Sequence, residues 1–165
     1  MKSKLTIIKI GGKIISNNNL LEKYIKKITS FSGNIVLVHG GGNIANEYFK
    51  ENNYPIKMIE GRRVTDKKTL EKLVMLYAGL INKNIISKLS TSEKKYIGLS
   101  GIDSKVILSE KRKIKKIDYG YVGDIKKIDG DFIKLLIKNK TFPVFCPITA
   151  DKNGELLNTN ADTIA

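Results

Sequence analysis

The amino-acid sequence predicts an α/β protein with an open, mainly parallel sheet, helices on both faces and a β-hairpin insertion. Short β-rich runs alternate with amphipathic helical runs in the first half of the chain, as crossover connections between parallel strands require. Glycine clusters follow the first two strand runs, at the edge of the sheet where ligands bind in this fold class. After residue 95 the pattern changes to short apolar runs separated by turn residues, which predicts the hairpin.

Four segments carry the alternation in the first half. Residues 5–10 (LTIIKI) and 34–40 (NIVLVHG) predict strands, and residues 20–30 and 44–52 predict helices. The first of these helices follows three asparagines, which are favoured as N-caps, and its apolar residues recur four apart along one face. We therefore expect two strand–helix units side by side.

The strongest helix signal runs from Asp66 to Leu89, with Thr65 as the expected N-cap. Its apolar residues fall on one face, namely Leu70, Leu73, Val74, Tyr77, Leu80, Ile81 and Ile85. A helix of this length predicts a spine of the domain or a contact in a homodimer.

The second half predicts several shorter elements. The tract DYGYVGD marks the hairpin, a helix is expected from Asp131, and the run PVFCPI (143–148) predicts a buried strand. The other expected strands lie at 96–101, 105–109 and 113–128. Since no linker or repeat divides the chain and 165 residues can enclose one core, we expect one domain over 1–165.

The net charge of +14 raises nucleic acid as a partner, but the kind of basic residue argues against it. Of 30 basic residues only Arg62, Arg63 and Arg112 are arginine, whereas base readers and phosphate clamps favour the planar guanidinium fork. The densest run, SEKRKIKK (109–116), is interpreted as a solvated hairpin edge. We expect no nucleic-acid partner.

Targeting signals are also missing from the sequence. No run of eighteen apolar residues suggests a membrane span, and the chain opens directly into a strand pattern. Cys146, the single cysteine, lies in an apolar run and is interpreted as a buried thiol. We therefore expect a cytoplasmic protein with no membrane partner.

Two glycine clusters form the candidate anion site. Gly11 and Gly12 follow the first strand, and Gly40, Gly41 and Gly42 follow the second, each before a helix. Glycine lets backbone N–H groups approach a ligand, and the helix N-terminus behind adds partial positive charge. Neither cluster matches a named nucleotide fingerprint, so a tight strand–helix connection remains the alternative.

Charged residues near these loops support the expectation of an anion site. Lys9 lies on an otherwise apolar strand, where it either meets an anion or faces solvent on an edge strand. Arg62 and Arg63 precede the long helix, and arginine suits carboxylate or phosphate recognition. His39, the sole histidine, is expected to be packed or hydrogen-bonded at a strand end, and no ligand spacing predicts a metal site.

Seven motifs together resemble a known family. They are KIGG (9–12), HGGG (39–42), GRRVTD (61–66), AGLINKNI (78–85), GLSGID (98–103), YGYVGD (119–124) and LNTNADTIA (157–165). In this order they resemble the acetylglutamate kinases of the amino acid kinase superfamily, in wording closest to a subgroup from the Bacteroidetes lineage. The resemblance covers the whole chain and implies an amino acid kinase-like fold.

The resemblance implies transfer of a phosphoryl group from ATP, with Mg²⁺, to the γ-carboxylate of N-acetyl-L-glutamate, the second step of arginine biosynthesis. It implies that Lys9 stabilises the transferring group and that Asp162 orients catalytic lysines. The glycines Gly11 and Gly12 match the loop near the ATP phosphates.

The substrate-binding residues follow from the same resemblance. Gly41 and Gly42 match the backbone that binds the substrate and the moving phosphate. Arg63 matches the arginine that holds the α-carboxylate, and Asn158 matches an asparagine that contacts the substrate. N-succinyl-L-glutamate is an alternative substrate for the subgroup.

The family pattern continues past Ala165, so the resemblance implies that residues 1–165 form the acyl-glutamate-binding part and that the carboxyl-terminal nucleotide half is absent. The segment NTNADTIA is then expected to begin a helix, and the chain alone is expected to be inactive. Another amino acid kinase, a non-catalytic basic binding module and a lone sugar- or nucleotide-binding domain remain as alternatives.

Overall fold

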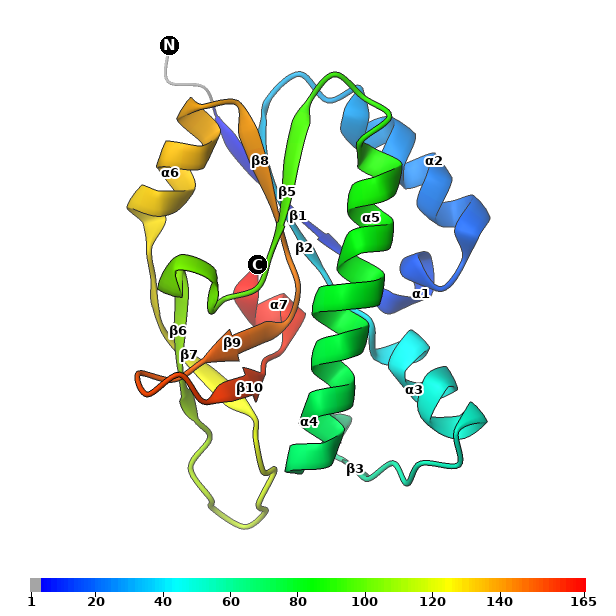
Figure 1. Cartoon of the computed structure of the whole chain (residues 1–165), viewed down its shortest axis with the longest axis vertical. Coiled ribbons are helices and arrows are strands. Elements are labelled where there is room, and N and C mark those ends of the chain that lie inside the picture. The colour runs from blue at the N-terminus through cyan, green and yellow to red at the C-terminus, as the bar shows by residue number, and fades with distance from the viewer. Residues whose placement is uncertain (1–3) are drawn as a thin grey trace.

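A four-stranded parallel sheet forms the centre of the protein, in a computed structural model that describes residues 4–165 (Figure 1). The strand order is β1-β2-β8-β5, and all three neighbouring pairs are parallel. The strands are β1 (Leu5–Ile10), β2 (Asn34–His39), β8 (Thr141–Phe145) and β5 (Lys95–Leu99). The predicted open parallel sheet is confirmed.

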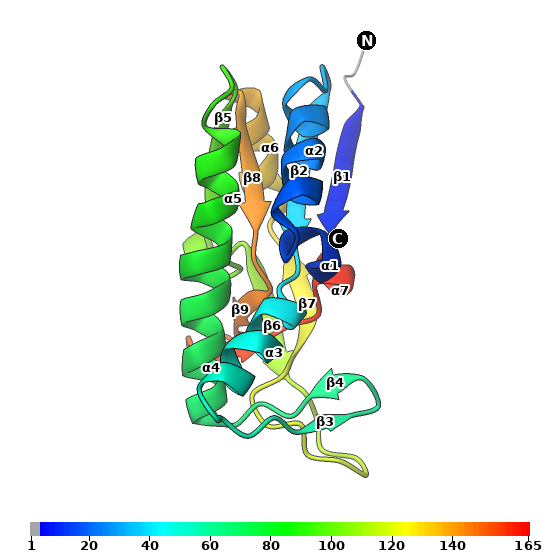
Figure 2. The ribbon, with the colours of Figure 1, turned by 90° about the vertical axis from the view of Figure 1, so that its right-hand side faces the viewer.

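Helices cover both faces of this sheet, as predicted (Figure 2). One face packs against α1 (Gly12–Ile15), α2 (Asn18–Thr29), α3 (Gly42–Glu51) and the long helix. The other face packs against α6 (Gly130–Lys138) and α7 (Ala161–Ile164). The start of a helix at the end of the chain is therefore confirmed.

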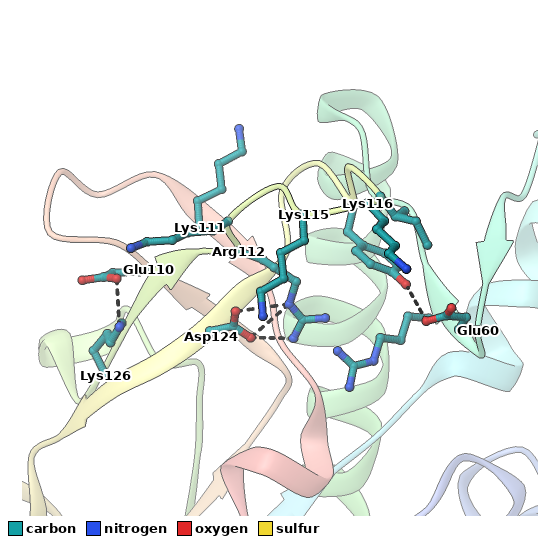
Figure 3. Close-up of a pocket in the computed structure, with 12 residues that line it drawn as sticks. Glu60, Glu110, Lys111, Arg112, Lys115, Lys116, Asp124 and Lys126 are labelled. Carbon is teal, nitrogen blue, oxygen red and sulfur yellow. Dashed lines mark hydrogen bonds and ion pairs between the residues drawn. The ribbon is translucent and has the colours of Figure 1, made fainter.

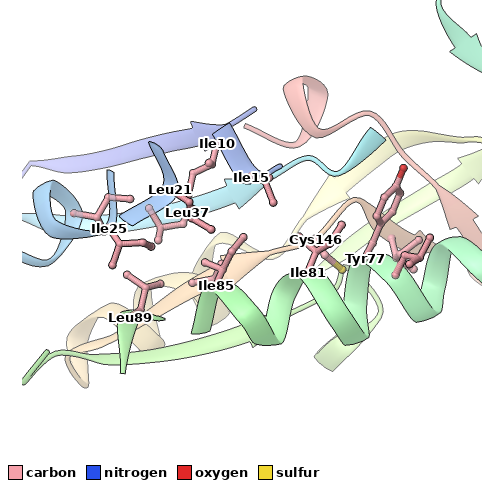
Figure 4. Close-up of a cluster of buried hydrophobic side chains, with 14 of the residues drawn as sticks. Ile10, Ile15, Leu21, Ile25, Leu37, Tyr77, Ile81, Ile85, Leu89 and Cys146 are labelled. Carbon is pink, nitrogen blue, oxygen red and sulfur yellow. The ribbon is translucent and has the colours of Figure 1, made fainter. Parts of the chain in front are cut away.

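The long helix consists of α4 (Lys67–Val74), the π-helical segment η1 (Met75–Ile81) and α5 (Asn82–Leu89). Its apolar face packs against β2 and β8 in the larger core cluster, which includes Tyr77, Ile81, Ile85 and Leu89 (Figure 4). The prediction of one long helix is right, but the π-helical segment was not predicted. π-Helical turns are rare and are frequently found at functional sites.

The N-cap of this helix is Asp66, and the prediction of Thr65 is wrong. The Asp66 carboxylate accepts a hydrogen bond from the Thr69 backbone N–H at 2.7 Å. Thr65 is buried, and its backbone N–H donates to the Tyr119 carbonyl oxygen. The threonine is thus occupied by a tertiary contact that its neighbours in the sequence do not reveal.

A smaller second sheet has the order β10-β9-β6-β7. Strands β6 (Ile107–Lys111) and β7 (Gly123–Ile128) form the predicted antiparallel hairpin. They are followed by β9 (Ile148–Ala150) and β10 (Leu156–Asn158). Two short elements complete the fold, the ribbon of β3 (Met58–Ile59) with β4 (Arg62–Arg63) and the 3-10 turn η2 (Asp103–Lys105).

Two strand predictions differ from the structure. The expected strand at 113–128 is reduced to β7, and the run at 143–148 is divided between β8 and β9 around Cys146 and Pro147. The interpretation of 109–116 as a solvated hairpin edge holds for most of the run, because β6 pairs with β9 only at Leu108 and the residues from 110 to 116 are exposed except the half-buried Arg112. Ser109 is buried, and the residues after Lys111 form a loop.

Cys146 is buried, as expected, and burial raises the pKa of its thiol to about 12. Among residues 4–165, every helix is too short or too polar to cross a membrane.

Candidate functional site

The two glycine loops meet at the carboxyl ends of β1 and β2. The Gly40 backbone N–H donates to the Ile10 carbonyl oxygen at 2.9 Å, which ties the end of one strand to the end of the other. A Cβ placed on Gly40 would lie 3.6 Å from the Gly12 nitrogen, and one on Gly12 would lie 3.5 Å from the Asn43 nitrogen. The loops are therefore adjacent, and the helices α1 and α3 begin side by side.

The first turn of α3 is open to a ligand. It has no side-chain N-cap and no acidic residue, so its first N–H groups lack partners within the helix. A Cβ on Gly42 would meet no atom within 4 Å, whereas one on Gly41 would lie 2.7 Å from Ile81 Cδ1 and 2.8 Å from Tyr77 Cε1. Gly41 thus permits close packing on the long helix, and the neighbouring N–H groups face open space that suits an anion.

Lys9 lies beside Gly11 in the first glycine loop and is paired with Asp162. Its Nζ is 2.9 Å from Asp162 Oδ1, and a Cβ on Gly11 would lie 3.8 Å from the same Nζ. Strand β1 is at the edge of the sheet, which agrees with the alternative that places Lys9 on an edge strand. The Lys9 side chain is 31% exposed and that of Asp162 is 71% exposed, which leaves the ammonium accessible.

Asp162 is held in place by the start of α7. Its backbone N–H donates to the Asn160 side chain at 2.7 Å, and Asn160 is the N-cap of that helix. The polar part of the NTNADTIA segment thus fixes the carboxylate that faces Lys9.

Arg63 is buried against α3. Its Nη2 donates to Asn46 Oδ1, and its guanidinium carbon lies 5.0 Å from the centroid of the Phe49 ring. Burial lowers the pKa of Arg63, and the nearby Tyr77 opposes this effect. Arg63 Nη1 is buried without a hydrogen-bond partner in the described chain, so a carboxylate at this position would satisfy a donor that is otherwise unpaired.

Asn158 is connected to Arg63 through Thr65. The Asn158 side chain donates to Thr65 Oγ1 at 3.1 Å, and Thr65 Oγ1 donates to the Arg63 carbonyl oxygen at 3.2 Å. Gly120, with a φ of 71°, lies against Thr65, and a Cβ on Gly120 would be 2.2 Å from the carbonyl oxygen of Thr65. This glycine allows the hairpin loop to approach the ribbon that carries Arg63.

The predicted site residues therefore form one connected region. Asn158 and Asp162 belong to consecutive elements, Arg63 contacts α3, and α3 begins at Gly42 beside Gly12. The arrangement combines a half-exposed ammonium, two adjacent loops of backbone N–H groups and a buried guanidinium. It can bind two anionic groups next to each other.

A buried network that sequence reasoning missed supports the second glycine loop. His39 Nδ1–H donates to the Gly40 carbonyl oxygen at 2.7 Å, and the Asn82 side-chain amide donates to His39 Nε2 at 3.2 Å and to the Val144 carbonyl oxygen at 2.9 Å. Because a carbonyl only accepts and this amide nitrogen only donates, the ring is the neutral Nδ1–H tautomer. Burial lowers the pKa of His39 to about 4, despite the opposing bond to Gly40.

The partners Asn82 and Asn46 were not predicted as functional residues. The only sequence signal for Asn82 is a polar residue on the apolar face of a long helix. The hydrogen-bonded state expected for His39 is confirmed.

The residues of this site suit anionic groups better than they suit a metal ion. Within residues 4–165, no group of three or more histidine, cysteine, aspartate or glutamate side chains is placed to hold a metal. We therefore assign no metal ligand to the described part of the chain.

Comparison with known proteins gives consistent results. Residues 4–165 match the Amino acid kinase family. A curated acetylglutamate kinase of Phocaeicola vulgatus is 46% identical over 165 residues, which are 100% of this chain and 64% of the relative. That of Cytophaga hutchinsonii is 48% identical over 163 residues, which are 98% of this chain and 62% of the relative. The chain thus spans less than two thirds of the length of these relatives.

Solved structures share the fold. A crystal structure of a protein of Streptococcus mutans UA159 has a TM-score of 0.84 and 31% identity, and the match covers 98% of this chain and 65% of that one. N-acetylglutamate synthase of Neisseria gonorrhoeae, complexed with coenzyme A and N-acetyl-glutamate, has a TM-score of 0.81 and 18% identity over 96% of this chain and 37% of that one. The second likeness concerns the fold alone.

Proposed function

The chain belongs to the amino acid kinase family, and we propose that its protein transfers the γ-phosphoryl group of ATP to the γ-carboxylate of N-acetyl-L-glutamate. The observation that carries the proposal is that Lys9, paired with Asp162, lies beside Gly11, in the first of two adjacent glycine loops, while α3 of the second loop contacts the buried Arg63. Residues 1–165 would then supply the acyl-glutamate-binding part of the kinase domain. The reaction would serve arginine biosynthesis in the cytoplasm.

The reaction needs no general base. A γ-carboxyl group with an ordinary pKa of about 4.3 is ionised at neutral pH, and its oxygen can attack phosphorus directly. A new P–O bond forms to the carboxylate while the bond to the ADP oxygen breaks, which gives N-acetylglutamyl 5-phosphate and ADP. When bound, ATP with Mg²⁺ supplies the phosphoryl group and part of the charge neutralisation.

The residues of the chain lower the barrier by positioning and charge. Lys9 offers its ammonium to the phosphoryl oxygens, and Asp162 fixes the orientation of that ammonium. The N–H groups after Gly11 and Gly41 bind phosphate or carboxylate oxygens at the two helix starts. The main obstacle to the reaction is the repulsion between the substrate carboxylate and the phosphates of ATP. These groups hold the two anions next to each other in spite of it.

Arg63 and Asn158 would hold the substrate at its other end. The unpaired Nη1 of Arg63 suits the α-carboxylate, and Asn158 is kept beside it through Thr65. N-succinyl-L-glutamate is the alternative substrate, since the groups that we assign recognise the glutamate part and not the acyl chain.

We also propose that the protein is a homodimer that pairs through the long helix. Met75 and Leu80 on this helix are 65% and 51% exposed, so the helix presents large apolar side chains that a second copy could cover. A molecular mass by light scattering equal to that of one chain would contradict this part of the proposal.

A hydroxylamine trap for acyl phosphate tests the reaction. Because the chain is shorter than its relatives, we would assay it as given and joined to the carboxyl-terminal remainder of the Cytophaga hutchinsonii relative. Substrates would be N-acetyl-L-glutamate, N-succinyl-L-glutamate and L-aspartate, each with Mg²⁺ and ATP. Lys9→Met would be compared with Lys26→Met, a matched change on the exposed face of α2.

We expect hydroxamate with an acylated glutamate, and we expect only the Lys9 variant to lose it. A folded chimera that binds ATP but forms no hydroxamate with either acylated substrate would overturn the assignment. Hydroxamate from L-aspartate alone would indicate another amino acid kinase. ATP-independent binding of nucleic acid with steep salt dependence would instead favour the basic binding module.

A further inference from the structure

A basic cavity lies outside the proposed active site, between the hairpin loop 112–122 and the β3–β4 ribbon (Figure 3). Its volume is about 920 Å³. Its lining contains seven basic residues, Arg62, Lys111, Arg112, Lys113, Lys115, Lys116 and Lys126, and three acidic ones, Glu60, Glu110 and Asp124. The cavity therefore carries an excess of four positive charges.

The acidic residues are already occupied. Arg112 Nε donates to both Asp124 oxygens at 3.1 and 3.2 Å, and Lys126 Nζ lies 3.0 Å from Glu110 (Figure 3). The third acid, Glu60, accepts a hydrogen bond from the Tyr119 hydroxyl group at 3.5 Å. The Tyr119 hydroxyl group is neutral, so Glu60 keeps its negative charge, and the seven basic residues of the lining still exceed the three acidic ones by four.

The remaining cations approach the cavity from separate elements. Arg62 comes from the ribbon, Lys111 from the end of β6, and three lysines, at 113, 115 and 116, from the loop. Lys111 Nζ lies 4.0 Å from the centroid of the Tyr121 ring, and Arg112 Nη1 is buried without a hydrogen-bond partner. Cations that line the same cavity repel each other, and a bound anion would relieve that repulsion.

The cavity is separate from the proposed active site because neighbouring residues of a strand face opposite sides. Arg63 is buried against α3, and the preceding Arg62 lines the cavity. The two faces of one short ribbon thus present one arginine to each site.

We propose that this cavity binds a small anion with at least two phosphate groups. Lysine ammonium groups bind phosphate as point charges, and cations on two sides of a cavity of this volume suit more than one phosphate. A small ligand is favoured over nucleic acid because the unpaired cations line a hollow between two hairpins.

Calorimetric titration of the 165-residue chain with sodium tripolyphosphate tests the proposal at constant ionic strength. The loop variant Lys113→Gln/Lys115→Gln/Lys116→Gln would be compared with a control that changes Lys23, Lys26 and Lys27, three exposed lysines of α2, to Gln. Both variants lose three positive charges, and Figure 1 shows α2 at the opposite end of the molecule from the loop. Circular dichroism would establish that each variant is folded.

We expect the loop variant to bind tripolyphosphate about tenfold more weakly and the control to change less than about twofold, since each exposed charge contact contributes a small factor. Equal losses in the two variants, or no binding by the unchanged chain, would overturn the proposal. The proposal would also be overturned if inorganic phosphate bound as tightly as tripolyphosphate. It would be overturned as well if the loop variant lost binding of a short single-stranded RNA but kept binding of tripolyphosphate. Binding that survives in Lys9→Met would separate this cavity from the kinase site, whatever the hydroxamate assay shows.

Discussion

Replacement of Asn82 by alanine should destabilise the protein through its buried network. The side chain is 1% exposed, and its amide is the hydrogen-bond donor to His39 Nε2 and to the Val144 carbonyl oxygen. Without it, the described chain offers His39 Nε2 no other partner, and the Val144 oxygen loses one of its contacts. An unsatisfied buried polar group costs about 1–3 kcal/mol, so we expect a total loss of about 2–4 kcal/mol.

Urea unfolding followed by circular dichroism would measure this loss, with Asn84→Ala as the matched control. Asn84 is exposed on the same helix, so both changes gain the same small increment of helix propensity while only one removes the network. Free energies of unfolding for the two variants that agree within about 0.5 kcal/mol would refute the reasoning.

Three further predictions concern His39, Gly98 beside Asn82, and the ion pair of Lys9 with Asp162. His39 has a pKa of about 4 in the fold against 6.5 in the unfolded chain, so the unfolded state binds more protons between these values. Stability should therefore fall by at most about 3 kcal/mol as the pH is lowered from 6.5 to 4, and urea titrations of His39→Gln should lack this part of the slope. Gly98→Ala would place a Cβ 1.9 Å from Asn82 Oδ1. We expect this overlap to lower the free energy of unfolding by about 1–3 kcal/mol and the thermal midpoint with it. A Cβ on Gly79 meets no atom within 4 Å, so Gly79→Ala should not lower the midpoint. Asp162→Asn should change the free energy of unfolding by less than about 1 kcal/mol, because the ion pair with Lys9 is exposed to solvent. The same variant should lower the hydroxamate yield of the chimera. An unchanged yield would contradict the role of Asp162 in orienting Lys9.

Much of the fold follows from local patterns in the chain. The strand at 5–10, the helix signal up to Leu89 and the glycine positions depend on periodicity and on turn chemistry, which act over a few residues. These features were predicted with small errors at their ends. The π-helical segment was not predicted, and within it the expected apolar face is partly wrong: Leu80 is 51% exposed, whereas Leu76 is buried.

The errors and the open alternatives concern features that depend on distant partners. Thr65 has the chemistry of an N-cap, but its backbone pairs with the hairpin loop at Tyr119 and Tyr121, and Asp66 caps the helix instead. The sequence left open whether Lys9 meets an anion or lies on an edge strand, and only the strand order places β1 at an edge. Neither the strand order nor a contact between segments more than fifty residues apart is encoded in a local pattern.

The sequence by itself determined the α/β class, the position of each glycine loop and the residues that make up the candidate site. Only the tertiary structure decided that Lys9 faces Asp162 and that Asn82 fixes the His39 tautomer. It also decided that Arg63 is buried, with no hydrogen-bond partner for Nη1 among residues 4–165, while Arg62 lines a basic cavity. The physical reason is that propensity and periodicity act between near neighbours in the chain. Burial, charge pairing and hydrogen-bond satisfaction depend on which segments the fold brings together.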